Sequence, residues 1–115
     1  MPYDEKLADR IRALLAGENA VSEKKMFGGL AFLLNGNMCV SASRRGGLLA
    51  RIDPADTDVA VSRPHVSLMK MGGRSMAGWI TVAPEGLKTK RELTTWVHRA
   101  VAFARTLPPK SRKGR

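Results

Sequence analysis

The sequence predicts an α+β fold, a two-layer sandwich in which helices pack on one antiparallel sheet. Helical periodicity marks both ends of the chain, and a hairpin signature lies between them at Asn35-Gly36. The expected order is a helix, three or four strands, a short helix, two strands and a long helix. The 115 residues are the length of one domain. We expect that domain to span residues 1–109 and a flexible basic tail to span 110–115.

The first helix is expected from Asp4 to Ala16. Gly17 follows it as a natural stop, and the apolar residues recur at helical spacing: Leu7, Ile11, Leu14 and Leu15. A short strand over Lys24–Phe27 should then end at Gly28–Gly29, where a bulge or a close backbone approach is expected.

Asn35-Gly36 lies between two apolar runs and predicts a type I′ hairpin, because both residues tolerate a positive φ. A two-residue loop would pair Leu33 with Met38 and Phe32 with Cys39. One face would then carry Leu30, Phe32 and Cys39, and the other Ala31, Leu33, Met38 and Val40. Both faces are apolar, so we expect helices or a second copy of the protein to cover each of them.

Short sequence patterns between residues 48 and 82 predict further strands and one short helix. Leu48–Ile52 is expected to be a strand, and Asp53 to cap a short helix that ends near Val61. Residues 66–76 predict a strand and a mobile loop, and residues 78–82 another strand.

The last helix has the clearest start. Thr89 with Glu92 three positions later forms a capping box, and Pro108 stops the run. Its apolar side should pack on the sheet: Leu93, Trp96, Val97, Ala100, Val101 and Ala104.

Twenty Lys and Arg against ten Asp and Glu give a formal charge of +10. The candidate nucleic-acid contacts are Lys24, Lys25, Arg44, Arg45, Lys110, Arg112, Lys113 and Arg115. No recognised nucleic-acid motif accompanies them, and only 5% of residues are aromatic. Two interpretations stay open: solvated basic side chains, or weak and non-specific nucleic-acid binding.

Residues capable of chemistry are scattered. Cys39 lies mid-strand and is expected to be a small buried apolar residue, while His98 lies on the polar side of the last helix and His65 in a connector. We therefore expect no catalytic residue, metal site or cofactor, and no enzymatic activity. A polar pocket lined by Arg51, Asp53 and Arg74 would argue against that expectation.

The single cysteine excludes an internal disulfide. The N-terminus is polar, and no apolar run is long enough to span a bilayer. These features predict a cytoplasmic protein without membrane association.

A methionine-rich segment is the candidate partner-binding site: Met69, Lys70, Met71, Arg74 and Met76. Methionines beside flexible glycines suit an adaptable protein-binding surface. The alternative is that these methionines fill the core. A homodimer is a further alternative, because one hairpin face could lack a cover within the monomer.

Four segments occur in an order that resembles a known family: Lys25–Gly29, Arg51–Asp53, Gly73–Met76 and Gly78–Trp79. Together they make the chain similar to the TfoX/Sxy N-terminal domain family over nearly its whole length, roughly from Asp4 to Pro109. Each motif is short, so the specificity lies in their joint order and spacing.

The resemblance implies a secretion-chaperone-like fold and a regulatory role without catalysis. Full-length members promote natural competence as co-activators that work with the cAMP receptor protein. The resemblance thus implies a protein partner, such as the cAMP receptor protein, and a role in transcription regulation. Full-length members also carry a helical C-terminal domain, and we expect this chain to be a stand-alone N-terminal domain.

Overall fold

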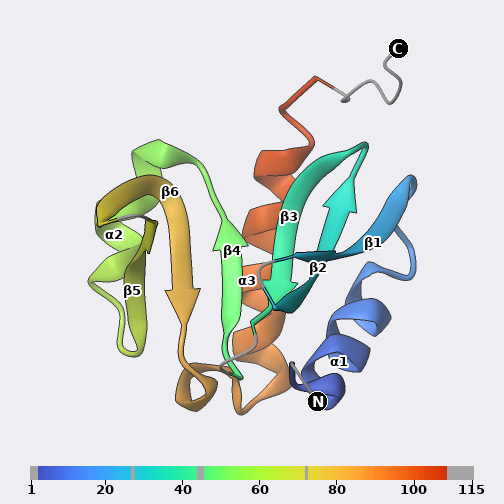
Figure 1. Ribbon diagram of the computed structural model, residues 1–115, viewed down its shortest axis with the longest axis horizontal. Helices are drawn as coiled ribbons and strands as arrows, with labels where there is room; N and C mark the ends of the chain where they lie inside the picture. Colours follow the sequence, from blue (N-terminus) through green and yellow to red (C-terminus); the bar gives the residue numbers. More distant parts are fainter. Residues whose placement is uncertain (1–2, 27, 44–45, 72, 109–115) are drawn as a thin grey trace.

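The computed structural model describes residues 3–26, 28–43, 46–71 and 73–108. They form a six-stranded antiparallel sheet in the order β1-β2-β3-β4-β6-β5, with the helices packed on it (Figure 1). The strands are β1 (Val21–Met26), β2 (Gly29–Leu34), β3 (Asn37–Ala42), β4 (Leu48–Arg51), β5 (Val66–Met71) and β6 (Arg74–Val82). The helices are α1 (Glu5–Leu15), α2 (Thr57–Val61) and α3 (Lys90–Ala104), with 3-10 turns η1 (Pro54–Asp56) and η2 (Pro84–Leu87). The predicted α+β class and element order are confirmed, with four strands before α2.

Side chains cap both long helices. One carboxylate oxygen of Asp4 accepts hydrogen bonds from the backbone N–H groups of Lys6 and Leu7, at 2.9 and 3.2 Å. The predicted capping box of α3 is present: Thr89 Oγ1 accepts from the N–H of Glu92 at 3.1 Å, and Glu92 Oε1 accepts from the N–H of Thr89 at 3.1 Å. These contacts satisfy N–H groups that the first helical turn leaves without partners.

The β2–β3 hairpin has the predicted type I′ turn, with φ of 53° at Asn35 and 81° at Gly36. Leu33 pairs with Met38 as expected, but Phe32 pairs with Val40. The predicted pairing of Phe32 with Cys39 is therefore wrong, because a bulge at Cys39 adds one residue to β3. As a result Val40 shares its face with Phe32, and both Cys39 and Val40 belong to the main core.

The loop expected within residues 66–76 is shorter than predicted. Met71 pairs with Arg74, so only residues 72 and 73 connect β5 to β6. Gly73 has a φ of +80°, a conformation that a two-residue hairpin turn uses readily. The strand expected at Lys24–Phe27 also begins earlier, at Val21.

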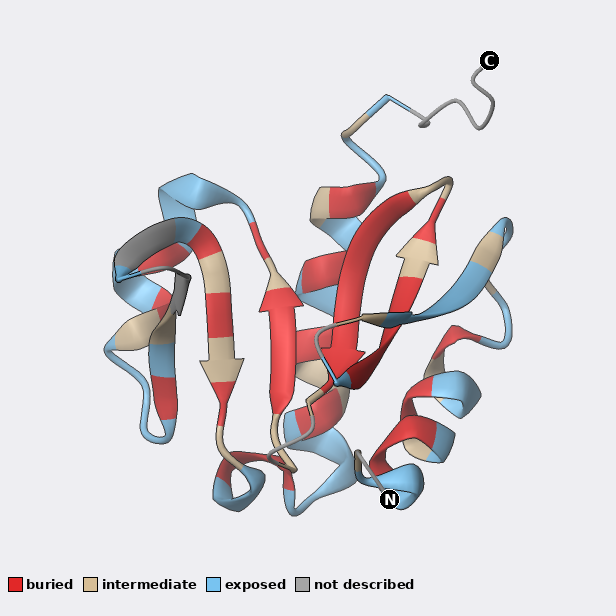
Figure 2. Ribbon diagram, viewed as in Figure 1, coloured by how far each residue is buried: buried red, intermediate tan, exposed pale blue. Residues whose placement is uncertain are grey.

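The main core lies between one face of the sheet and the helices (Figure 2). Its largest fully buried side chains include Phe32, Ile11, Leu48, Ile80 and Leu93. Ala60 of α2 belongs to the same cluster. Burying one such large apolar side chain stabilises a fold by roughly 1.5–3 kcal/mol, so this layer holds the domain together.

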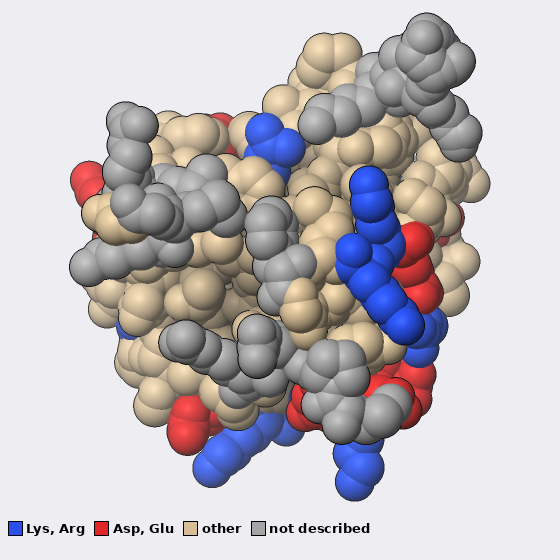
Figure 3. All heavy atoms as spheres, in the orientation of Figure 1, with Lys and Arg blue, Asp and Glu red and all other residues tan. Residues whose placement is uncertain are grey.

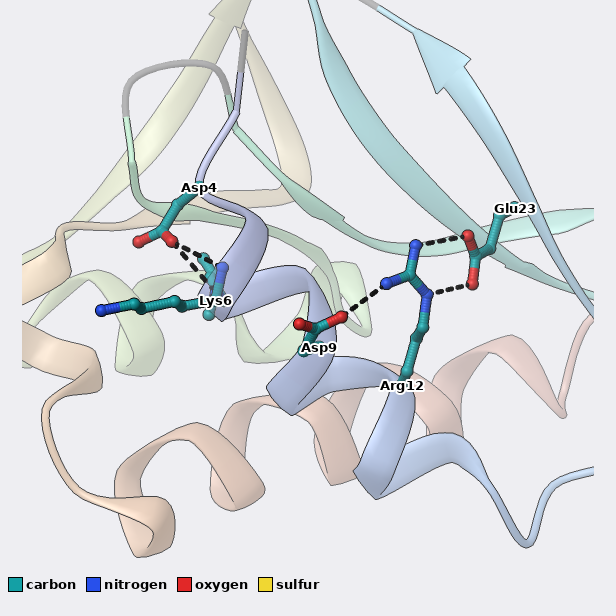
Figure 4. A network of polar contacts seen from close by, with 6 residues as sticks. Asp4, Lys6, Asp9, Arg12 and Glu23 are labelled. Atoms are coloured by element: carbon teal, nitrogen blue, oxygen red, sulfur yellow. Dashed lines mark hydrogen bonds and ion pairs between the residues drawn. The ribbon is translucent and has the colours of Figure 1, made fainter. Parts of the chain in front are cut away.

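Partly exposed ion pairs lie at the edge of this layer, beside α1 and after α3. Arg12 of α1 donates to both carboxylate oxygens of Glu23 on β1, at 2.6 and 2.9 Å, and to Asp9 at 2.7 Å (Figure 4). The hydrogen bonds from Arg12 lower the pKa of the Glu23 carboxyl group. Arg105, which follows α3, pairs with Glu18 in the connection between α1 and β1.

We expect Gly78→Ala to destabilise the protein by roughly 2–3 kcal/mol. Gly78 has a φ of +84°, and a Cβ there would lie 2.9 Å from the carbonyl oxygen of Ile52. Gly17→Ala is the control, because a Cβ at that position meets nothing within 4 Å. Denaturant unfolding of both variants measures the difference, and equal stabilities would contradict the strain argument.

Candidate functional site

The face of the sheet opposite the main core is apolar, and no helix of the described residues lies over it (Figure 1). Three buried residues form its centre: Ala31, Met38 and Leu49. Four partly buried side chains pack around them: Met26, Leu33, Met69 and Trp79. We call this surface, with the side chains that the register adds to it, the open face.

The strand register adds two cations to the open face. Lys24 is opposite Ala31, and Arg51 is opposite Trp79. Opposed residues in an antiparallel pair share a face, so both side chains rise from the same surface as the apolar cluster. The face thus combines apolar area with positive charge.

Arg51 is held in place by aromatic rings. Its guanidinium carbon lies 5.1 Å from the ring centroid of Trp79 and 5.6 Å from that of Phe103 on α3. Both distances fall within the range of cation–π attraction. Arg51 therefore links the open face to the end of the helical layer and keeps its charge beside Trp79.

The open face has no carboxylate. All ten Asp and Glu residues of the chain are described, and the six strands contain only one of them, Glu23. Glu23 is opposite the core residue Phe32 and bonds Arg12 of α1, so it points to the helical side. In the space-filling view, the visible acidic atoms lie toward the periphery of this face (Figure 3).

The predicted partner-binding segment contributes to this face in part. Met69 packs against the cluster at the centre of the open face. The backbones of Lys70 and Met71 lie in β5, and those of Arg74 and Met76 in β6, while their side chains lie outside what the structure describes.

The two predicted basic residues that the structure describes project from opposite sides of β1. Lys24 lies on the open face, but the neighbouring Lys25 is opposite the core residue Leu30 and so projects from the other side of β1. Arg44, Arg45 and the tail cations Lys110, Arg112, Lys113 and Arg115 lie outside the described residues.

Sequence reasoning did not assign Leu49, Arg51 and Trp79 to a binding surface. The signal available was the alternation within β4, where Leu49 and Arg51 are two residues apart and share a face. Their placement beside Trp79 depends on the pairing of β4 with β6, which are separated by α2 and β5 in the chain. No local pattern indicates that pairing.

Cys39 is a buried apolar residue, as predicted, with 1% of its surface exposed. Burial raises the pKa of its thiol to about 12, and the nearby Glu18 carboxylate adds to the rise. A thiol with such a pKa is protonated at neutral pH, so it is a poor nucleophile.

His98 is exposed on α3, as expected. His65 has a φ of +66° and lines a cavity of about 280 Å³ with Arg63, Arg91 and Glu92, among others. Glu92 already accepts hydrogen bonds from the N–H and hydroxyl groups of Thr89. These bonds lower the pKa of Glu92, so its carboxylate serves the helix cap and is a weak base.

Asp53 caps the turn η1 and lies at a groove on the helical side of the sheet. Its carboxylate accepts from the N–H of Ala55 at 2.9 Å and lines a groove of about 530 Å³ between α2 and α3. That groove is lined on its other side by Arg99 and Phe103 and does not include Arg51.

Within the described residues, no three His, Cys, Asp or Glu side chains lie close enough to hold a metal ion. In the same part of the chain, no helix has both the length and the apolar character that crossing a bilayer requires.

The fold and the open face define a small α+β domain with one helical layer and a second apolar sheet face over which no described helix lies. The chain belongs to the TfoX N-terminal domain family, whose model matches residues 13–104. No curated protein and no solved structure gives a significant match to it.

We expect the Cys39 thiol to resist modification by an aromatic disulfide reagent at pH 8 until the protein unfolds. Because Cys39 is the only cysteine, the released chromophore reports on this group alone. Rapid modification of the folded protein would contradict the burial.

The same thiol should make stability depend on alkaline pH. Its contribution is intact below a pH of about 9, where both states keep the proton, and it declines as the pH rises toward 12. Over that range the unfolded chain has lost the thiol proton while the folded chain retains it. The decline should be shallower in Cys39→Ala, as measured by denaturant unfolding at each pH.

Proposed function

We propose that this chain is a non-enzymatic regulatory domain that acts by binding a protein partner on the open face. The observation that carries the proposal is an apolar sheet face that combines Trp79, Arg51 and Lys24 and has no described helix over it. Apolar surfaces with charged margins that are partly accessible to solvent, as Leu33 and Trp79 are here, are typical of protein-binding sites.

The finer role follows from the family. Membership supports a regulatory domain related to those that act in competence, and we propose that this chain is a transcriptional co-regulator. A transcription factor such as the cAMP receptor protein is the first partner to test. The high pKa of Cys39 and the commitment of Glu92 to a helix cap support a role without catalysis.

Photo-cross-linking in living cells tests the proposal. We expect a photoreactive p-benzoylphenylalanine in place of Leu33 to give a specific protein adduct, because Leu33 lies half-buried on the open face. The matched control places the same group at Val59 on α2, which is 62% exposed. Mass spectrometry identifies the adduct.

An adduct with a transcription component at position 33 and none at 59 is the expected result. Equal labelling at both positions, or no adduct at 33 from folded protein, would count against the open face as the binding site.

The charge of +10 favours nucleic-acid binding as the second candidate function. If the four tail cations contact duplex phosphates, removing residues 110–115 should reduce the log–log salt slope by about 3.6. Titration of labelled duplex DNA at several salt concentrations, with and without the tail, measures this slope. Absence of binding at low salt would rule this candidate out.

A further inference from the structure

We propose that the open face receives an acidic amphipathic helix supplied by the protein partner. This inference rests on the proposed function and specifies the chemistry of the partner at the same site.

The backbone of the sheet indicates that the occupant is a helix. The strands that carry the centre of the open face, β2, β3 and β4, each have a neighbour on both sides, although β3 pairs with β4 only over Val40–Ala42. Where the strands pair, their N–H and C=O groups are directed along the sheet to neighbouring strands and are not available to a segment lying on the face. A segment buried there must satisfy its own backbone, and a helix does so internally. Helices also cover the other face of this sheet.

The charge of the face indicates that this helix is acidic. Lys24 is exposed, Arg51 is stacked on Trp79, and no carboxylate stands on the surface to neutralise them. None of the three ion pairs between described residues uses Lys24 or Arg51. A helix with apolar residues on one side and Glu or Asp along its margins would cover the apolar cluster and meet both cations.

The same observations disfavour the other occupants. A second copy packed face to face would oppose cationic surfaces that have no acid to pair with them, and like charges across an interface disfavour association. Nucleic acid would meet the cations, but its phosphates would lie against the apolar side chains of Met26, Leu33 and Met69. Trp79, the aromatic residue of the cluster, is already stacked with Arg51.

The test uses synthetic peptides and the full chain. One labelled peptide of about 18 residues carries Leu on one helical side and Glu on its margins. A second peptide has Gln in place of every Glu, and a third has Lys. Fluorescence anisotropy measures affinity, and NMR chemical-shift mapping locates the site.

We expect the Glu peptide to bind about tenfold more tightly than the Gln peptide and the Lys peptide not to bind. Shift changes should centre on Leu33, Leu49 and Trp79. Lys24→Glu and Arg51→Gln should each weaken binding of the Glu peptide several-fold and leave the Gln peptide unchanged. Lys6→Glu and Arg91→Gln make the same charge changes on exposed residues of α1 and α3, and they should leave both affinities unchanged. Thermal unfolding identifies any variant that has lost its fold.

Equal affinity for the Glu and Gln peptides would overturn the acidic part of the inference. Absence of binding, or shift changes confined to α1 and α3, would overturn it entirely. In both cases a specific adduct at position 33 in cells would leave the proposed function standing. Shift changes on the open face with a duplex oligonucleotide, but not with the Glu peptide, would assign the site to nucleic acid.

Discussion

The organisation of this domain depends on a sheet that is apolar on both faces and is covered by helices on one. The hairpin formed by β2 and β3 has large apolar side chains on alternate positions of both sides. The helical layer buries Phe32, Leu34 and Val40, and the opposite side retains Leu33 and Met38. The helical side removes enough apolar area from water to form a core, so the fold does not depend on a helix over the opposite side.

Acidic and basic residues are distributed differently on the two sides of the sheet. Carboxylates lie on the helices, the connections and the helical side of β1, where Glu18 and Glu23 pair with arginines. The open face has cations without acids. Like charge around this apolar surface opposes contact between copies of the chain, and Lys24 on the edge strand β1 hinders strand-to-strand association as well. Such a surface is selective, because a partner must bring both apolar area and negative charge.

Local signals were sufficient to predict most elements. The capping box at Thr89, the Asn35-Gly36 turn and the helical periodicity of α1 each depend on residues a few positions apart, and each was predicted correctly. The bulge at Cys39 was missed because nothing in the alternation of β3 distinguishes an extra residue from a regular one. The open face was only half predicted. Its hairpin residues were visible in the sequence, but the contact of Arg51 with Trp79 requires β4 and β6 to pair across an intervening helix and strand.

Three of the four segments that carry the family resemblance each supply a residue to the open face. Lys25–Gly29 supplies Met26, Arg51–Asp53 supplies Arg51, and Gly78-Trp79 supplies Trp79, although long stretches of chain separate them. Two glycines of these segments, Gly29 and Gly78, allow close backbone approaches next to the open face. A Cβ at Gly29 would lie 2.3 Å from the carbonyl oxygen of Ala42, so glycine lets β2 approach the end of β3. Gly78 has a positive φ and accepts the N–H of Ile52 at 2.7 Å, which fixes the residue before Trp79 against the end of β4. Other residues of the same segments, Lys25, Ile52 and Asp53, lie on the helical side, so these segments join the open face to the core beneath it.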